Sequence, residues 1–143
     1  MSMMGMFTGL NISASGLRAQ RLRQNVIASN LANAETTRTP EGGPYRRRDV
    51  VFSTDQQASP FSAVFQMELA EGVRVADVIL DDRAPELRYM PGHPDADANG
   101  FVAYPNVDVN TELVDLMIAR RVHEANATAF QAAKAMLKRA LEI

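Results

Sequence analysis

The fold is decided by residues 111–141, TELVDLMIARRVHEANATAFQAAKAMLKRAL, a proline-free stretch that forms a helix of about 46 Å at 1.5 Å per residue. At about 100° per residue, its apolar positions fall into two separate rows along the helix. The first row is Val114, Ile118, Val122, Ala125, Ala129, Ala132 and Met136; the second is Leu116, Ala119, His123, Asn126, Phe130, Ala133, Leu137 and Ala140. A helix in a simple two-stranded coiled coil needs only one such row. The sequence therefore predicts that this helix contacts more than one partner.

The start of this helix carries a capping signal. Asn110 is the predicted N-cap, and Val109 and Val114 are spaced as the hydrophobic staple that often flanks a cap.

The N-terminal segment has a similar pattern. Its apolar positions alternate at spacings of three and four, with two polar interruptions: Phe7, Leu10, Ala14, Leu17, Arg21, Gln24, Ala28 and Leu31. Ile12, Ala19, Leu22 and Val26 supply a second apolar face. We expect a helix that ends near Asn33 and is marginally stable alone, because the seam is small and broken.

All seven prolines lie between positions 40 and 105, so long helices are confined to the two ends of the chain. Three middle segments, 45–52, 72–80 and 101–104, are rich in β-branched and aromatic residues and are predicted strands. Residues 61–69 fit a strand or a helix equally well, and residues 81–100 are predicted to be a loop. The predicted fold is mainly α: long N- and C-terminal helices pair as a coiled coil (residues 1–35 and 107–143), with a small β-rich unit inserted between them (residues 36–106).

Composition excludes several classes of protein. The chain has 143 residues, 46% hydrophobic and 22% charged, which is typical of a folded domain and not of a disordered chain. The absence of cysteine excludes disulfides and thiol catalysis. No apolar run reaches the roughly 18 residues of a membrane helix, and the N-terminus does not resemble a cleaved secretory signal. A net charge of −2 argues against nucleic-acid binding.

The candidate chemical sites are weak. Residues 95–100, DADANG, match the opening of a calcium-binding loop, but Asn106 stands where the closing glutamate belongs, so a tight polar turn is the preferred reading. The basic run of residues 45–48 and the isolated His93 and His123 make neither a phosphate site nor a metal site. We therefore expect no catalytic, cofactor-binding or metal-binding residues, no cofactor and no small-molecule substrate: the protein is not an enzyme.

The two helices present four apolar faces, and a small β unit offers too little material to cover them. Burial of these faces within one domain is one explanation; coverage by other subunits is the favoured one, because contiguous apolar surface must be hidden from water.

Several motifs together resemble the flagellar axial protein family. They are residues 13–23 (SASGLRAQRLR) and 26–34 (VIASNLANA), which contain the rod-type run Ala32-Asn33-x-x-Thr36. Residues 36–47 (TTRTPEGGPYRR) and 100–108 (GFVAYPNVD) resemble the C-type branch of the proximal rod proteins, and the last helix carries Glu124-Ala-Asn126 and Ala133-Lys134. His123 departs from the pattern, since an aromatic residue such as tyrosine is expected there.

The resemblance implies a structural subunit of the bacterial flagellar basal-body rod in the periplasm. Such a subunit is exported by the flagellar type III apparatus without a cleaved signal and assembles into a helical tube that transmits torque. The implied partners are other rod proteins, the MS-ring and export-gate base, and copies of the chain itself. The expected assembly interface is Phe7, Leu10, Leu17, Leu31, Val114, Leu116, Ile118, Val122, Phe130, Met136 and Leu137. The alternative is an autonomous coiled-coil dimer that acts as a cytoplasmic adaptor.

Overall fold

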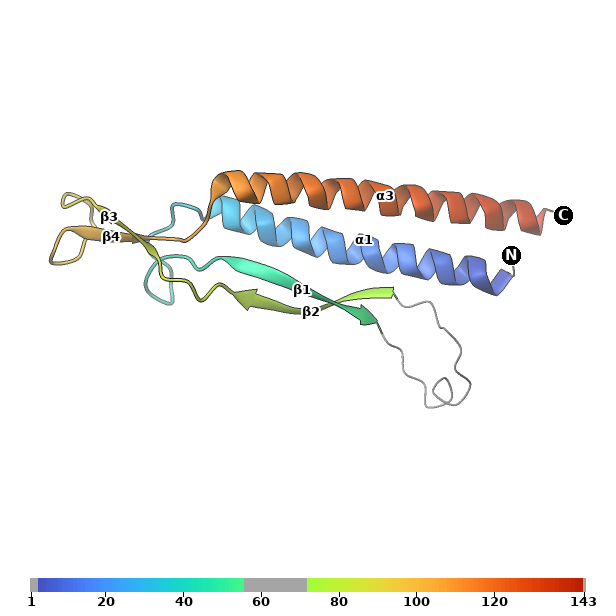
Figure 1. Ribbon diagram of the computed structural model, residues 1–143, viewed down its shortest axis with the longest axis horizontal. Coiled ribbons are helices and arrows are strands. Elements are labelled where there is room, and N and C mark those ends of the chain that lie inside the picture. Colours follow the sequence, from blue (N-terminus) through green and yellow to red (C-terminus); the bar gives the residue numbers. More distant parts are fainter. Residues whose placement is uncertain (1–2, 56–71, 143) are drawn as a thin grey trace, which may run out of the picture.

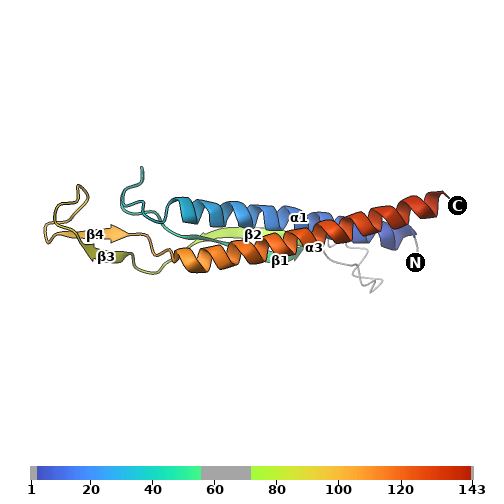
Figure 2. The same ribbon diagram turned by 90° about the horizontal axis from the view of Figure 1, so that it is seen from above.

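The computed structural model describes residues 3–55 and 72–142, and it shows an elongated molecule built on two long helices (Figure 1). Helix α1 spans Met3–Ala32 and helix α3 spans Val109–Leu141. They lie side by side and antiparallel, so that both termini are at the same end of the molecule (Figures 1 and 2). The predicted pair of terminal helices is confirmed, and so is the end of the first helix near Asn33.

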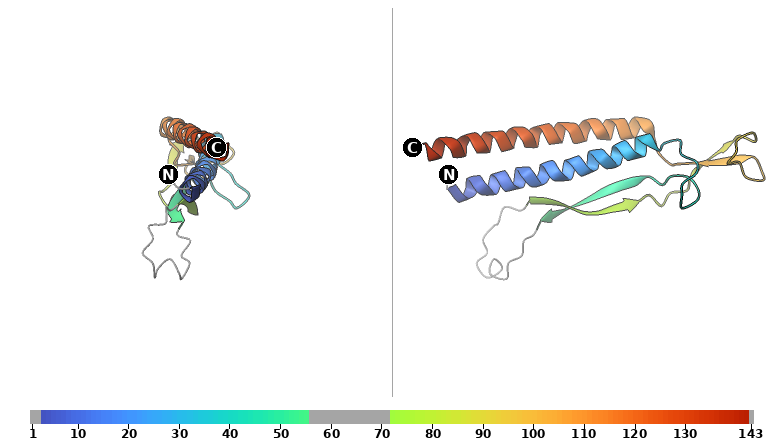
Figure 3. Two further views of the ribbon diagram at one scale, coloured as in Figure 1. Left: turned by 90° about the vertical axis from the view of Figure 1, so that its right-hand side faces the viewer. Right: turned by 180° about the vertical axis from the view of Figure 1, so that it is seen from behind.

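Two separate antiparallel hairpins form the β structure between the helices. Strands β1 (Arg48–Asp55) and β2 (Gly72–Leu80) pair with Arg48 opposite Leu80 and Asp55 opposite Gly72. Strands β3 (Glu86–Tyr89) and β4 (Phe101–Tyr104) pair with Glu86 opposite Tyr104. The β1–β2 hairpin runs along α1, whereas the β3–β4 hairpin extends beyond the helix pair at the end away from the termini (Figure 3).

The predicted strands at 72–80 and 101–104 are confirmed. The first strand begins three residues later than predicted, because Tyr45 is buried against the end of α1 and its N–H donates to the carbonyl of Thr36 instead of entering a sheet. The prediction that residues 81–100 form a loop is wrong at Glu86–Tyr89, where a strand pairs with 101–104. The ambiguous segment 61–69 lies outside the described residues.

A second correction concerns the start of α3. The N-cap is Asp108, not Asn110: the Asp108 carboxylate accepts from the Asn110 N–H at 3.0 Å and from the Thr111 hydroxyl at 2.9 Å. The helix therefore begins at Val109, two residues before the predicted start. A carboxylate at this position also interacts favourably with the positive end of the helix dipole, whereas an uncharged asparagine amide does not.

The cap gives the first testable prediction. Asp108→Ala is expected to lower the thermal midpoint of the protein measured by circular dichroism, because it leaves helix-end N–H groups without an acceptor. Asn110→Ala, which keeps the backbone N–H that Asp108 binds, is the matched control and is expected to change the midpoint little.

The stabilisation that the Asp108 cap gives to α3 should also depend on pH. Hydrogen bonds from the Thr111 hydroxyl and the Asn110 N–H lower the pKa of Asp108. The stabilisation is therefore present above the pKa that this carboxyl has in the unfolded chain, and it is lost as the pH falls through the lowered pKa of the folded protein. The thermal midpoints of wild type and Asp108→Ala should therefore converge in acid. An equal difference at neutral and acid pH would contradict the assignment.

Candidate functional site

A cluster of polar groups, in which Asn30, Tyr45 and Glu112 are buried and Arg48 takes part through its backbone, joins the two helices to the β1–β2 hairpin at the end of the molecule away from the termini. We call it the junction cluster, and its members are Asn30, Tyr45, Arg47, Arg48 and Glu112. Asn30 and Glu112 are 0% and 1% exposed. Asn30 lies in the last turn of α1 and Glu112 in the first turn of α3, while the three other residues lead into and begin β1.

The Asn30 amide is fully hydrogen-bonded. Its nitrogen donates to the Arg48 carbonyl at 2.8 Å and to the Glu112 carboxylate at 3.1 Å. Its oxygen accepts from the Tyr45 hydroxyl and from the Arg48 N–H, both at 3.0 Å. One side chain therefore ties together segments that are far apart in the sequence, and this use of every donor and acceptor is what allows an amide to be buried.

Glu112 is a buried carboxylate, and Arg47 supplies its counter-charge. The Arg47 Nε donates to Glu112 Oε1, and Arg47 also contacts Asp49 at 3.4 Å. Burial acts to lower the pKa of Arg47, but hydrogen bonding and attraction to Glu112, helped by Asp49, outweigh it, so that the pKa is raised. A buried carboxylate without such a partner would be strongly unfavourable.

The connection from α1 to this cluster is held by local hydrogen bonds. The Asn33 amide donates to the Ser29 carbonyl at 2.9 Å, and the Thr36 hydroxyl donates to Asn33 Oδ1 at 3.2 Å. The Thr36 carbonyl then accepts from the Tyr45 N–H at 3.0 Å. The run Ala32-Asn33-x-x-Thr36 thus turns the chain at the end of the helix and delivers Tyr45 to the junction cluster.

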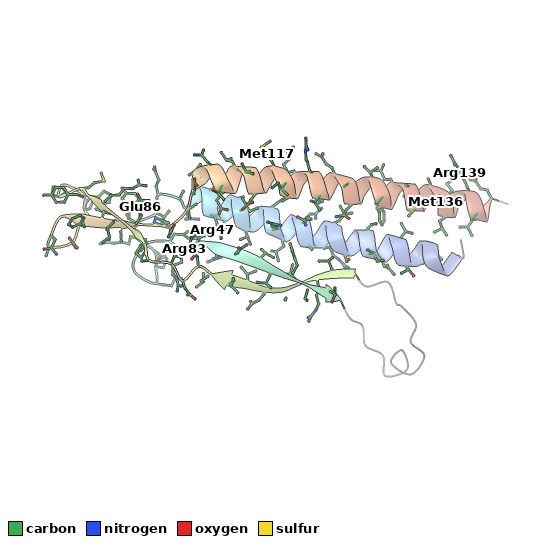
Figure 4. The ribbon with its side chains drawn as sticks, in the orientation of Figure 1. Arg47, Arg83, Glu86, Met117, Met136 and Arg139 are labelled. Atoms are coloured by element: carbon green, nitrogen blue, oxygen red, sulfur yellow. The ribbon has the colours of Figure 1, made fainter. Side chains whose placement is uncertain are left out.

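The two predicted rows of α3 have different environments. The second row faces α1: Ala119 is buried, and Leu116, His123, Asn126, Phe130, Ala133 and Leu137 are half-buried. Every member of the first row is exposed, and we call it the exposed stripe: Val114, Ile118, Val122, Ala125, Ala129, Ala132 and Met136. Its large members remain 38–55% exposed, and no described element of the chain covers them. Met117, 67% exposed, adds to the apolar surface on the side of α3 away from α1 (Figure 4).

The predicted row of α1 does not lie at the centre of its contact with α3. Phe7, Arg21 and Ala28 are exposed, and Leu10, Leu17 and Leu31 are half-buried. The residues that α1 buries are instead small or polar with one exception, Ile27; they are Ser13, Ser15, Gly16, Ala19, Ile27 and Asn30. Gly16, Gln24 and Asn30 of α1 contact α3, so α1 contributes small and polar side chains to this contact, whereas the large side chains of the first row of α3 remain exposed.

The second apolar face of α1 is covered by the β1–β2 hairpin. The Val73 N–H donates to the Ser15 hydroxyl at 2.9 Å, and Ala19 and Leu22 line a shallow groove with Val73 and Val75. Of the four apolar faces inferred from the sequence, this one is therefore partly covered within the chain: Ala19 is buried, whereas Leu22 remains 36% exposed.

The β3–β4 hairpin carries another exposed apolar patch. Leu87, Tyr89 and Phe101 share one face and are 64%, 66% and 39% exposed, and the rings of Tyr89 and Phe101 meet edge to face at 5.3 Å. The opposite face holds the buried Val102 and Tyr104, with Arg88 over the Tyr104 ring at 4.4 Å.

The groups considered for chemistry have structural roles. Asp97 Oδ1 accepts from the N–H groups of Asn99 and Phe101, which confirms the tight turn into β4, and Asp95 binds Arg38 and Thr37. His93 Nδ1 accepts from the Asp95 N–H. Over residues 3–55 and 72–142, no group of three or more acidic or histidine side chains is placed to hold a metal ion. Within the same ranges, no helix has the length and apolar character that crossing a membrane requires.

The most buried polar residues, Asn30 and Glu112, were missed as site residues. The sequence marks Glu112 only as an acidic residue in a first helical turn, where such residues normally face water. The available signal was the arginine run of residues 46–48 at the start of a predicted strand, whose charges need acidic partners.

Comparison with known proteins gives a consistent assignment at both ends of the chain. Residues 10–38 match the family described as flagella basal body rod protein, and residues 98–143 match the family described as flagellar basal body rod FlgEFG protein C-terminal. The chain is 44% identical to the flagellar basal-body rod protein FlgC of Bacillus subtilis, over 96% of this chain and 97% of that protein. It is 45% identical to the FlgC of Salmonella typhimurium and 40% identical to that of Borreliella burgdorferi, over 98% of both chains in each case.

The junction cluster makes a quantitative prediction. Glu112→Ala removes the buried partner of Arg47 and leaves one donor of Asn30 unpaired, and breaking a buried pair in this way costs about 3 kcal/mol of unfolding free energy. Urea unfolding followed by circular dichroism measures it. Glu124→Ala, at an exposed position on the same helix, is the control and should stay within about 0.5 kcal/mol of wild type. Equal effects of the two substitutions would contradict the role of the cluster.

Proposed function

Because the chain belongs to the FlgC family of flagellar basal-body rod proteins and is a structural subunit of the proximal rod, we propose that the exposed stripe of α3 is the surface through which it packs against neighbouring subunits. Proteins of this family assemble with other rod proteins. The particular neighbours of this chain named below are proposed.

The proposal rests on one observation: an unbroken apolar row of α3 is exposed, while the second apolar row of α3 already packs against α1. Full burial of a Val, Ile or Met side chain is worth about 1.5–3 kcal/mol, so covering the exposed half of each large side chain contributes roughly 1 kcal/mol. Val114, Ile118, Val122 and Met136 together supply a substantial driving force for association. Contiguous surface of this kind on a soluble chain marks an interaction site.

The N-terminal helix offers a second contact surface. Phe7, 50% exposed, and the half-buried Leu10, Leu17 and Leu31 lie on the flank of α1. Leu116, Phe130 and Leu137 complete the expected interface, and they also face α1 in the same chain. Two different exposed apolar surfaces on one molecule favour heterologous contacts between subunits. Such contacts do not close into a ring and so generate a helical tube.

This arrangement also divides the chain into an inner and an outer part. Residues 1–35 and 107–143 would form the helical core of the tube, and residues 36–106 its outer layer. The neighbours would be other rod proteins, copies of this chain and, at the base, the MS ring and export gate. Export through the flagellar type III channel in an unfolded state suits a chain without disulfides or cofactors, and the assembled tube would transmit torque.

The alternative of a cytoplasmic coiled-coil adaptor was based on apolar rows alone. The same rows fit a rod subunit, and membership of the rod family favours the rod.

A charge on the exposed stripe tests the proposal. Ile118→Asp is expected to abolish motility and to remove the chain from purified hook–basal bodies, because an unpaired carboxylate would be buried between subunits. The circular dichroism spectrum of the soluble protein should stay unchanged, since Ile118 is 47% exposed in the single chain.

Gln131→Asp is the matched control. Gln131 is exposed on α3 and lies about 135° around the helix from the stripe, at 100° per residue. Normal motility from Ile118→Asp, or equal loss from both variants, would overturn the assignment of the stripe.

A further inference from the structure

The contact between α1 and α3 has one continuous register. A Cβ at Gly16 would lie 2.9 Å from the Asn126 amide nitrogen. Further along, the Gln24 amide donates to the Ala119 carbonyl at 3.3 Å, and Asn30 donates to Glu112. In each pair the two residue numbers add up to 142 or 143, so the helices run past each other without a slip.

The same register places Gln20 opposite His123, midway along the contact. Gln20 Oε1 and His123 Nδ1 are both buried, and neither has a hydrogen-bond partner among the described residues. Buried polar atoms in native proteins are rarely left unpaired, and each one costs stability. Here two such atoms occur at the same level of the same contact.

Their chemistry is complementary. A glutamine amide offers both a donor and an acceptor, and Nδ1 of a neutral imidazole is a donor in one tautomer and an acceptor in the other. A rotation of the Gln20 amide, or the Nδ1–H tautomer of His123, therefore satisfies both groups with one hydrogen bond. Exchanging the oxygen and nitrogen of the amide, or choosing the other histidine tautomer, leaves all other heavy atoms in place.

We propose that Gln20 and His123 form a hydrogen-bonded pair that, together with the junction cluster, holds the register of the two helices. The junction cluster lies at one end of the contact, and a small residue such as Gly16, which faces α3 nearer the middle, discriminates little between registers. A shift of one heptad would place Gln20 against Phe130 or Leu116 and leave its amide unpaired. Single buried polar residues fix register in coiled coils in the same way.

The register matters because it determines where the exposed stripe lies relative to α1 and the hairpins. The pair is internal to one chain, however, and the inference does not depend on which neighbours cover the stripe.

Disulfide trapping tests the register directly, since the chain has no cysteine of its own. Gly16→Cys with Asn126→Cys reports the observed register, because a Cβ at Gly16 would lie 2.9–3.1 Å from the Asn126 side chain, which the second substitution replaces. Gly16→Cys with Ala119→Cys, or with Ala133→Cys, reports a slip of one heptad in either direction. The assay uses the purified full-length protein under mild oxidation, with the disulfide yield measured by mass spectrometry.

In the otherwise wild-type chain, the Gly16/Asn126 pair is expected to exceed each slipped pair by more than tenfold, because a slip would break both the junction cluster and the Gln20–His123 pair. Gln20→Leu with His123→Leu should lower that preference on the order of tenfold, the worth of one buried hydrogen bond, and the exchanged pair Gln20→His with His123→Gln should restore it. A purely space-filling role would not be restored by the exchange.

Three results would overturn the inference. The leucine double variant could keep the full preference for Gly16/Asn126, the exchanged pair could slip as the leucine variant does, or the wild-type chain could cross-link equally in all three pairs.

Discussion

The burial of one carboxylate, Glu112, determines how the rest of the molecule is arranged. A charge that is 1% exposed is tolerated only with its counter-ion and hydrogen-bond donors in place, and these come from the end of α1 and the start of β1. Asn30 and Arg47 must therefore arrive together with the first turn of α3. This requirement joins both helices and the β1–β2 hairpin at one end, and the helices then run side by side towards the termini (Figure 1).

Along the helices the usual distribution of side chains is partly reversed. α1 presents Gly16, Gln24 and Asn30 to α3, whereas Ile118 and Val122 of α3 remain exposed. The exposed stripe therefore contributes little hydrophobic energy to the folding of a single chain. If other subunits cover it, as we propose, that energy would become available on assembly, which is the behaviour a rod subunit needs if it is to assemble at its destination and not before.

The sequence was sufficient for the features that depend on local pattern. The two rows of α3 follow from helical periodicity, and the structure separates them as one row towards α1 and one towards solvent. The actual contact face of α1 was not predictable in this way, because glycine, serine and glutamine carry no hydrophobic signal. The strand at Glu86–Tyr89 was missed because a four-residue strand between prolines is recognisable only from its partner. Asn30 and Glu112 were missed because their burial arises from contacts between segments that are distant in the sequence.

If the exposed stripe packs between subunits in the rod, a side chain on it should lose its access to water on assembly. The rate at which a water-soluble maleimide labels Ile118→Cys, the chain's single thiol, measures this access in the soluble protein and in hook–basal bodies purified from motile cells of that variant. We expect rapid labelling of the soluble protein and strong protection in the assembled particle. Equal labelling rates in the two states would contradict it.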